Sequence, residues 1–172
     1  LLPDPKRVLA KPYLPGEEIT PGGDTRSGVL MKRVLAIPER EVPKLVAELL
    51  AGFGERHAHF AELLASHFEA VAHHVPAGYA MSADRRLLVG GYFTHEYSVE
   101  AAALFNPSIV LAPGSNDDAS REQPFVMSVR AVGEGHISSI GFRSGRIDAQ
   151  ASLTFDATGP HVVGGSRAAP AW

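Results

Sequence analysis

The sequence predicts an α+β fold in which an N-terminal arm and a helical hairpin precede antiparallel β strands. Two changes of pattern predict this fold. Apolar residues recur at helical spacing between residues 39 and 104, and strand-like runs follow one another from residue 105 onward. Because no crossover helix separates the later strands, an antiparallel meander is favoured over a βαβ arrangement. We therefore divide the chain into residues 1–38, 39–104 and 105–172.

Residues 1–38 are expected to form an extended arm that contains strands. Prolines within the run from residue 7 to residue 16 forbid a helix interior and suit an edge strand. A second strand is predicted for residues 29–37, which are mostly apolar and lie between a Gly-rich loop and Pro38. An arm of this kind usually wraps another surface.

Residues 39–104 are expected to be helical. A first helix opens near Glu41 and ends at the glycines of residues 52–54, and a second lies within residues 55–75, so that the two form an antiparallel hairpin. Ser82 is predicted to cap a third helix that continues to residue 92. A short helix is predicted from Ser98 to Leu104, where the following Asn-Pro pair would end it.

Residues 105–172 are expected to form an antiparallel β region. Strands are predicted for residues 108–111, 125–132 and 136–143. Ser144 and Gly145 fit a tight turn into a further strand at residues 146–148. Alternation in the second of these strands places Phe125, Met127, Val129 and Ala131 on one face and Val126, Ser128, Arg130 and Val132 on the other.

Charge and composition exclude several classes of function. The 172 residues include 16 Lys and Arg against 19 Asp and Glu, a net charge of −3, which disfavours a general nucleic-acid binder. The absence of cysteine excludes disulfides, thiolate catalysis and Cys-based metal sites. No apolar run is long enough to span a bilayer and no secretory signal is evident, so we expect a cytoplasmic protein with no membrane partner.

The eight histidines do not have the spacing of a metal site. Five of them lie on the expected helical hairpin, where a pair of ligands on one face should be three or four residues apart, and no pair has that spacing. His95-Glu96 begins like a zinc-protease motif, but Val99 occupies the place of the required second histidine. We therefore expect no metal.

The segment from Gly90 to Tyr97 is a candidate pocket wall. Its two central aromatic residues and His95, beside a Gly-Gly pair, have the chemistry of a carbohydrate pocket, in which rings pack on sugars and His or Glu binds hydroxyls. The alternative interpretation is ordinary packing, since aromatic clusters between a helix and a sheet more often form core.

Arg130 is a charged residue within an otherwise apolar strand and leads to a second candidate site. Because an unpaired buried guanidinium is costly, Arg130 either pairs with Glu134 or reaches solvent at the strand end. In the functional interpretation Arg130 and Asn106 donate to ligand hydroxyls, while Gly133 and Gly135 let the backbone approach the ligand closely. The residue types alone do not choose between the two interpretations.

Residues 105–110, 125–134 and 136–142 resemble the first blade of glycoside hydrolase family 130. The shared features are Phe-Asn-Pro, a strand carrying Arg130 and the following Ser-rich strand. The Arg-Val-Leu arm, the hairpin and Gly-Tyr-Phe-Thr-His-Glu-Tyr-Ser look like the N-terminal region of larger bacterial members. The family contains inverting phosphorylases and hydrolases of β-mannosides, built on a five-bladed β-propeller.

The resemblance implies a substrate-binding role for a small set of residues. Asn106 and Arg130 match positions that hold the mannosyl unit, and Ser138 or Ser139 lies where the next strand faces the same pocket. With the candidates suggested by the residues themselves, the expected substrate-binding set is Asn106, Arg130, Glu134, Ser138, Ser139 and His95.

The catalytic groups of the family are not matched in this sequence. The family's acid belongs to a Glu-Asp-Pro-Arg-like motif in a later blade, and no such motif occurs before Trp172. The sequence thus leaves open whether this chain is an enzyme. If it is, we expect an inverting hydrolase or phosphorylase whose catalytic acid lies outside the chain, with no cofactor and with inorganic phosphate as an optional co-substrate.

Length supports the view that the propeller is incomplete. The roughly 65 residues after Asn106 accommodate one blade and a fraction, because each strand with its turn uses about 8 to 12 residues. We expect exposed apolar sheet surface and a partner, either the remaining propeller segment or a second chain in a homo- or hetero-oligomer, besides the oligosaccharide. Two alternatives remain: a non-catalytic carbohydrate-binding or regulatory module, and an assembly module whose helical hairpin packs on a partner.

Overall fold

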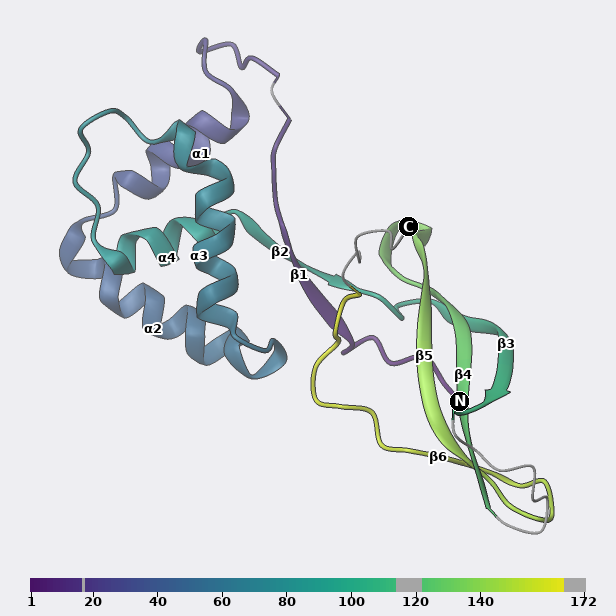
Figure 1. Ribbon diagram of the computed structural model, residues 1–172. Helices are drawn as coiled ribbons and strands as arrows, with labels where there is room; N and C mark the ends of the chain where they lie inside the picture. The colour runs from purple at the N-terminus through teal and green to yellow at the C-terminus, as the bar shows by residue number, and fades with distance from the viewer. Residues whose placement is uncertain (17, 114–121, 166–172) are drawn as a thin grey trace, which may run out of the picture. The chain divides into compact units, whose positions relative to one another are not determined.

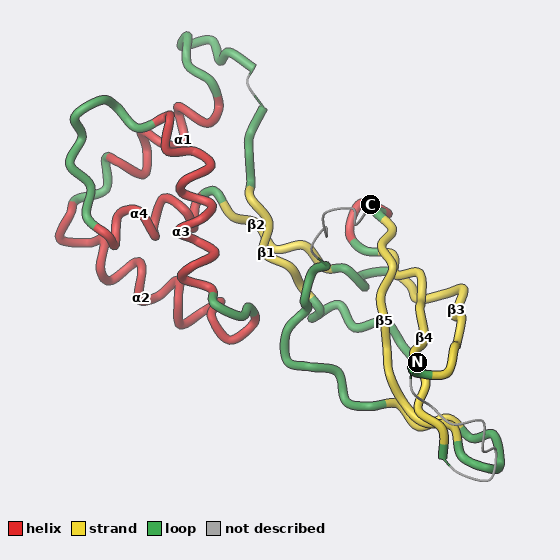
Figure 2. The backbone as a smooth tube through the Cα atoms, viewed as in Figure 1, coloured by secondary structure: helices red, strands yellow, loops and turns green. Residues whose placement is uncertain are grey.

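The computed structural model describes residues 1–16, 18–113 and 122–165 (Figure 1). The chain forms two compact units, a helical unit of Ala10–Glu96 and a sheet unit of Leu1–Leu9 with Tyr97–Trp172. The division falls within strands β1 (Val8–Pro12) and β2 (Thr94–Ser98), which pair with each other in a two-stranded sheet. Helices and antiparallel strands occupy separate segments, so the predicted α+β class is confirmed (Figure 2).

The helical unit contains α1 (Arg26–Leu35), α2 (Val42–Phe53), α3 (Phe60–Val71) and α4 (Ala83–Tyr92). The predictions of α2, α3 and α4 are confirmed. Ser82 is the N-cap of α4, as predicted, and its hydroxyl accepts a hydrogen bond from the backbone N–H of Arg85 at 3.1 Å.

Helix α1 corrects the strand predicted for residues 29–37. Thr25 caps this helix by accepting a hydrogen bond from the N–H of Gly28 at 3.0 Å. Met31 and Val34, three residues apart, face the core and are fully buried. The nearly continuous apolar run hid this helical spacing, and burial in the core outweighed the strand preference of its valines.

Helix α4 is the centre of the helical unit, because α2 and α3 pack against it more extensively than against each other (Figure 1). Two glycines make this possible. A Cβ on Gly90 would lie 2.0 Å from the carbonyl oxygen of Leu64 in α3, and a Cβ on Gly91 would lie 2.5 Å from the Leu49 side chain in α2. The Gly-Gly pair thus allows the helices to pack closely. In place of the expected hairpin of two helices, α2 and α3 both pack on α4.

The core of the helical unit is apolar and well covered. Its buried members come from all four helices and the residue that follows α4: Met31, Val34, Val42, Val46, Phe68, Val71, Leu88, Val89 and Phe93. Because each helix contributes its apolar stripe, the unit encloses its own core.

Arg85 is a buried charge at one end of this core, with 1% of its surface exposed. Its guanidinium donates to the carbonyl oxygens of Val34 and Ile37 at 2.8 and 2.7 Å and to Glu39 Oε2 at 2.6 Å. Hydrogen bonds from Ser82 and then Arg85 lower the pKa of Glu39. Arg85 therefore ties the end of α1 to the start of α4 with its charge compensated.

The sheet unit contains a four-stranded antiparallel meander in the order β3-β4-β5-β6. The strands are β3 (Ala103–Leu111), β4 (Gln123–Val132), β5 (Ser138–Ile147) and β6 (Leu153–Phe155). The predicted meander is confirmed, and so is the alternation in β4 as far as Ala131: Phe125, Met127, Val129 and Ala131 are buried, and Val126, Ser128 and Arg130 are not, but Val132 at the strand end is buried too.

Two local predictions in this region are wrong. Residues 99–102 form turns and bends rather than the predicted helix, and Glu100 is buried there. Gly145 lies within β5 rather than in a turn. A Cβ at this position would lie 2.7 Å from the Phe125 ring and 2.2 Å from the carbonyl oxygen of Thr154, so the glycine allows close packing inside the sheet.

The inner face of the sheet carries a small core and a buried ion cluster. Phe125, Met127 and Val129 form the core cluster. Glu100, 2% exposed, accepts from Arg143 and from Arg7 Nε at 3.1 Å, and from the N–H of Asp4 at 3.3 Å. This carboxylate thereby joins the N-terminal segment to β5.

The outer face of the sheet carries exposed apolar side chains among polar ones. Val110, Ile140 and Phe142 lie on it and are 62, 63 and 66% exposed. On the inner face, Ile109, Leu111 and Leu153 are also exposed. The sheet therefore presents apolar side chains on both faces, which matches the exposed apolar surface expected from the sequence.

Candidate functional site

Arg130, Ser138 and Phe105 form a cluster on the outer face of the sheet, where β4 ends and β5 begins. Arg130 pairs with Phe105 on one neighbouring strand and with Ile140 on the other. Its Nε and Nη2 donate to the Ser138 hydroxyl at 3.0 and 2.9 Å, and its Cζ lies 5.3 Å from the centre of the Phe105 ring. These contacts hold an exposed guanidinium in one orientation.

Asn106 lies beside this cluster in a β-bulge. Phe105 pairs with Arg130 and Ser108 with Ser128, so Asn106 and Pro107 together oppose the single residue Val129. Asn106 has a φ of 52°, in the left-handed region that asparagine tolerates better than most residues. Bulges of this kind re-aim side chains next to functional sites.

The remaining predicted residues of the sheet unit lie apart from the cluster. Ser139 pairs with Ala131, whose side chain is on the inner face, so Ser139 lies on the face opposite Ser138. Glu134 lies in an exposed 3-10 turn (Glu134–His136) and forms no ion pair with Arg130, which bonds Ser138 instead. Of the two alternatives for Arg130, the structure thus shows a solvent-exposed strand end rather than a Glu134 pair.

Gly133 has a packing role. A Cβ on this residue would lie 2.3 Å from the carbonyl oxygen of Ser98 and 2.4 Å from the hydroxyl of Tyr97. The close approach that this glycine permits is to the protein's own backbone, which corrects the expectation that it faces a ligand.

His95 belongs to the helical unit. Its side chain is exposed, and its ring meets the Tyr13 ring edge-on with centroids 6.2 Å apart. Within the same segment, Phe93 is fully buried in the helical core. The packing interpretation is therefore correct for Phe93.

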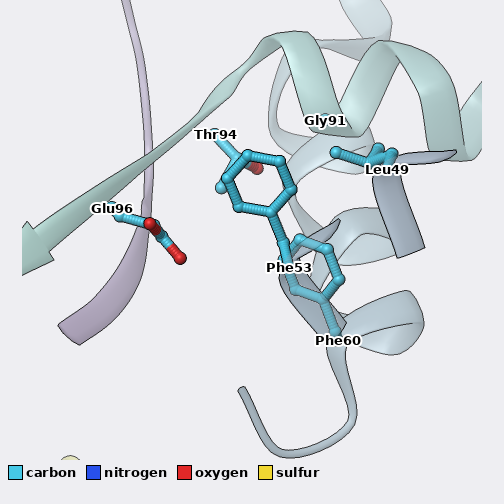
Figure 3. A pocket seen from close by; sticks show the side chains of 6 residues that line it. All are labelled: Leu49, Phe53, Phe60, Gly91, Thr94 and Glu96. Carbon is cyan, nitrogen blue, oxygen red and sulfur yellow. The ribbon is translucent and has the colours of Figure 1, made fainter. Parts of the chain in front are cut away.

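A pocket of about 90 Å³ lies in the helical unit and includes part of the Gly90–Tyr97 segment (Figure 3). Figure 3 shows Glu96 at one end, Leu49 at the other and two phenyl rings between them. The lining residues are Leu49, Phe53, Phe60, Gly91, Thr94 and Glu96. The aromatic walls come from α2 and α3 rather than from Tyr92 and Phe93.

The carboxylate of Glu96 is fixed by two neighbours on the turn between α2 and α3. Its Oε1 is 2.8 Å from Nε2 of the buried His57, and its Oε2 is 3.0 Å from a guanidinium nitrogen of Arg56. Arg56 also lies 4.8 Å from the centre of the Phe53 ring, and His57 stacks on Phe60 at 5.2 Å. The polar end and the apolar walls of the pocket are thus connected.

A short hydrogen-bond chain lies behind Thr94. The Thr94 hydroxyl donates to the carbonyl oxygen of Gly90 at 2.7 Å, so its oxygen must accept from Nδ1 of His67, also at 2.7 Å. Burial lowers the pKa of His67, and the nearby His95 lowers it further. The structure therefore favours the neutral imidazole of His67.

Phe105, His57 and Arg56 were not identified as site residues from the sequence. Phe105 was detectable, because it directly precedes the Asn-Pro pair. The partners of Glu96 lie 39 and 40 residues before it and carry no local signal.

Among the described residues there is no group of three or more His, Cys, Asp or Glu that could hold a metal ion. No helix in the described part of the chain is long and apolar enough to cross a bilayer.

No protein-family model, curated protein sequence or solved structure matches this chain.

Proposed function

We propose that this chain is part of a carbohydrate-active enzyme, a glycosidase or phosphorylase of β-mannosides, and supplies sugar-binding residues to a site completed elsewhere. The observation that carries the proposal is the cluster of Arg130, Ser138 and Phe105 beside the bulged Asn106. The completing part is a further propeller segment or a second chain.

The chemistry of the cluster suits a sugar. A pyranose ring presents hydroxyls around its rim and C–H groups on its faces, so it needs oriented donors and acceptors beside an apolar ring face. Arg130 offers fixed N–H donors, Asn106 offers an amide, and the exposed Phe105 offers a ring. Because Ser138 already orients the guanidinium, less side-chain entropy is lost on binding.

The exposed faces of the sheet support the proposal that it is one blade of a propeller. Antiparallel sheets with one solvated side carry polar residues on that side, whereas this sheet exposes Val110 and Phe142 on one face and Leu111 on the other. Propeller blades are covered on both faces by neighbouring blades. Arg130 and Ser138 lie at the end of the sheet, where such neighbours would leave an opening.

Asp148 and Glu134 do not form a catalytic pair. Inversion by water needs a proton donor and a base on opposite sides of the bond, about 6.5 to 9.5 Å apart. Asp148 Oδ1 accepts from the N–H groups of Gln150 and Ser152, which makes it part of a turn, and Glu134 is exposed. We therefore place the catalytic acid outside this chain, with phosphate as co-substrate if the reaction is phosphorolysis.

A second candidate is a non-catalytic carbohydrate-binding or assembly module. The observation that favours it is the exposure of Val110, Ile140 and Phe142 on the outer face, since exposed apolar side chains often mark interaction surfaces. A carbohydrate-binding module would keep the sugar contacts of Arg130 without any turnover, whereas an assembly module would bind no sugar.

The test is a titration of the chain with methyl β-mannoside and β-mannobiose, with and without phosphate. We expect saturable binding that weakens about tenfold in Arg130→Ala and in Asn106→Ala. Arg146→Ala is the matched control. Arg146 is an exposed arginine in β5, on the same face of the sheet as Arg130, and its substitution should leave binding unchanged. Release of mannose or mannose 1-phosphate would contradict the proposal that the catalytic acid lies outside this chain. Absence of binding would favour the assembly module.

A further inference from the structure

The pocket in the helical unit has a chemistry unlike that of the sugar-binding cluster. Four of its six lining residues contribute only hydrocarbon or ring surface: Leu49, Phe53, Phe60 and Gly91. Its polar end consists of Glu96 and of Thr94, whose hydroxyl hydrogen is already used on Gly90. A sugar would leave most of its hydroxyls without partners here, so the pocket disfavours sugars.

The polar end of the pocket accepts hydrogen bonds. Each oxygen of an ionised carboxylate has two lone pairs, and His57 and Arg56 use one on each oxygen of Glu96. Glu96 therefore retains one lone pair on each oxygen, and either can accept from a ligand hydroxyl. Because Arg56 compensates its negative charge, a neutral donor such as a hydroxyl fits better than a second cation.

The size of the pocket limits the ligand to a single ring. A closed apolar cavity of about 150 Å³ holds one benzene ring, whereas the volume of this pocket is about 90 Å³ and its Phe53 wall is 38% exposed, so a single ring would be enclosed only in part. The Phe53 and Phe60 rings stack with centroids 6.4 Å apart and 27° between their planes, so a ligand ring would meet aromatic surface.

We propose that this pocket is a binding site for a small neutral phenol, whose ring packs against Phe53, Phe60 and Leu49 and whose hydroxyl donates to Glu96. The pocket lies wholly within the helical unit. Its ligand binding is therefore separate from the sugar binding proposed for the sheet unit, and either can fail without the other.

The experiment is an NMR titration with four probes: p-cresol, toluene, cyclohexanol and methyl β-mannoside. The backbone amides of Gly91 and Thr94 and the methyl groups of Leu49 report on occupancy. We expect saturable shifts with p-cresol, binding about tenfold weaker with toluene because the hydroxyl bond is lost, and no shifts with the mannoside. Cyclohexanol should also bind more weakly than p-cresol, since it lacks the aromatic face.

Two variants test the assigned contacts. Leu49→Phe adds a ring to the half-buried wall and should abolish p-cresol binding, and its thermal unfolding is measured to check that the unit still folds. Glu96→Gln weakens the acceptor and should reduce affinity for p-cresol several-fold but leave affinity for toluene unchanged. Glu48→Gln, an exposed carboxylate beside Leu49 in α2, is the matched control and should change neither.

Three results would overturn the proposal. They are the absence of saturable p-cresol shifts at Gly91 and Thr94, equal affinities for p-cresol and toluene, and unchanged p-cresol binding in a folded Leu49→Phe variant. Mannoside shifts at these same residues would instead make the pocket a sugar site.

Discussion

The helical unit and the sheet unit differ in how they cover their apolar residues. The helical unit surrounds its core with four helices, and its close approaches at Gly90 and Gly91 are tight packing contacts. The sheet unit buries a core cluster of Phe125, Met127 and Val129 while it exposes Phe142 and Val110. A helical bundle can enclose its own core, whereas a lone sheet needs a covering layer on each apolar face. The helical unit therefore covers its own core, whereas the sheet unit leaves apolar side chains exposed on both faces.

The largest effect is expected at the buried ion cluster of the sheet unit. Glu100→Ala removes the carboxylate that accepts from Arg7 and Arg143, and leaves the buried Arg143 uncompensated. The free energy of unfolding of the sheet unit should fall by about 4 kcal/mol. Denaturant unfolding followed at sheet-unit amides by NMR measures this loss. Glu134→Ala, an exposed acid of the same unit, is the control, and an equal effect of the two changes would contradict the assigned role of Glu100.

The next largest effect is expected at the glycines of α4. Gly90→Ala places a methyl group against the backbone of α3, which cannot move alone, so the helical unit should lose about 3 kcal/mol. Gly91→Ala meets only the end of the Leu49 side chain, which can rotate, and should cost less. Thermal unfolding of the two variants checks this order. A smaller loss for Gly90→Ala than for Gly91→Ala would contradict the close contact of Gly90 with the backbone of α3.

A smaller, pH-dependent effect is expected from His67. Burial and His95 hold its pKa in the folded protein below the ordinary value of 6.5, so the unfolded chain binds the proton first as the pH falls. The free energy of unfolding of the helical unit should therefore decrease as the pH falls below about 6.5. At higher pH His67 is neutral in both the folded and the unfolded chain, so it should cause no change. His67→Asn, which can still donate near the Nδ1 position, should have a shallower pH dependence of unfolding. Identical pH profiles would contradict this assignment.

The smallest effect on stability is expected on the outer face of the sheet. Phe142 is 66% exposed, so Phe142→Ser should change the free energy of unfolding by less than about 0.5 kcal/mol. The same change should reduce the binding of a hydrophobic dye and the self-association of the chain. A loss of several kcal/mol would mean that this face is already covered within the chain.

The sequence predicted the elements whose pattern is local. Helices α2, α3 and α4 followed from apolar spacing and the Ser82 cap, and the two faces of β4 followed from alternation. Of the site, the resemblance predicted that Ser138 or Ser139 lies near Arg130, and the structure brings Ser138 to it. The hydrogen bond between Arg130 and Ser138 and the position of the guanidinium over the Phe105 ring were not predicted.

The predictions that were wrong depended on contacts far apart in the sequence. Residues 99–102 form turns in which Glu100 is buried by Arg7 and Arg143, which lie 93 and 43 residues away. Helix α1 was missed because strand-favouring residues hid the spacing of Ser27, Met31 and Val34, which are all buried. Gly145 resembles a turn glycine locally, and only its contact with Phe125 explains it.

The most direct test of the proposed function follows the side-chain Nε–H resonance of Arg130 during a titration with β-mannobiose. That group donates to Ser138 at 3.0 Å in the free protein, so a sugar that binds the guanidinium must perturb its resonance. We predict a saturable shift of this resonance, and no shift of the Arg146 resonance. An unchanged Arg130 resonance at saturating β-mannobiose would contradict the proposal that this end of the sheet binds the sugar.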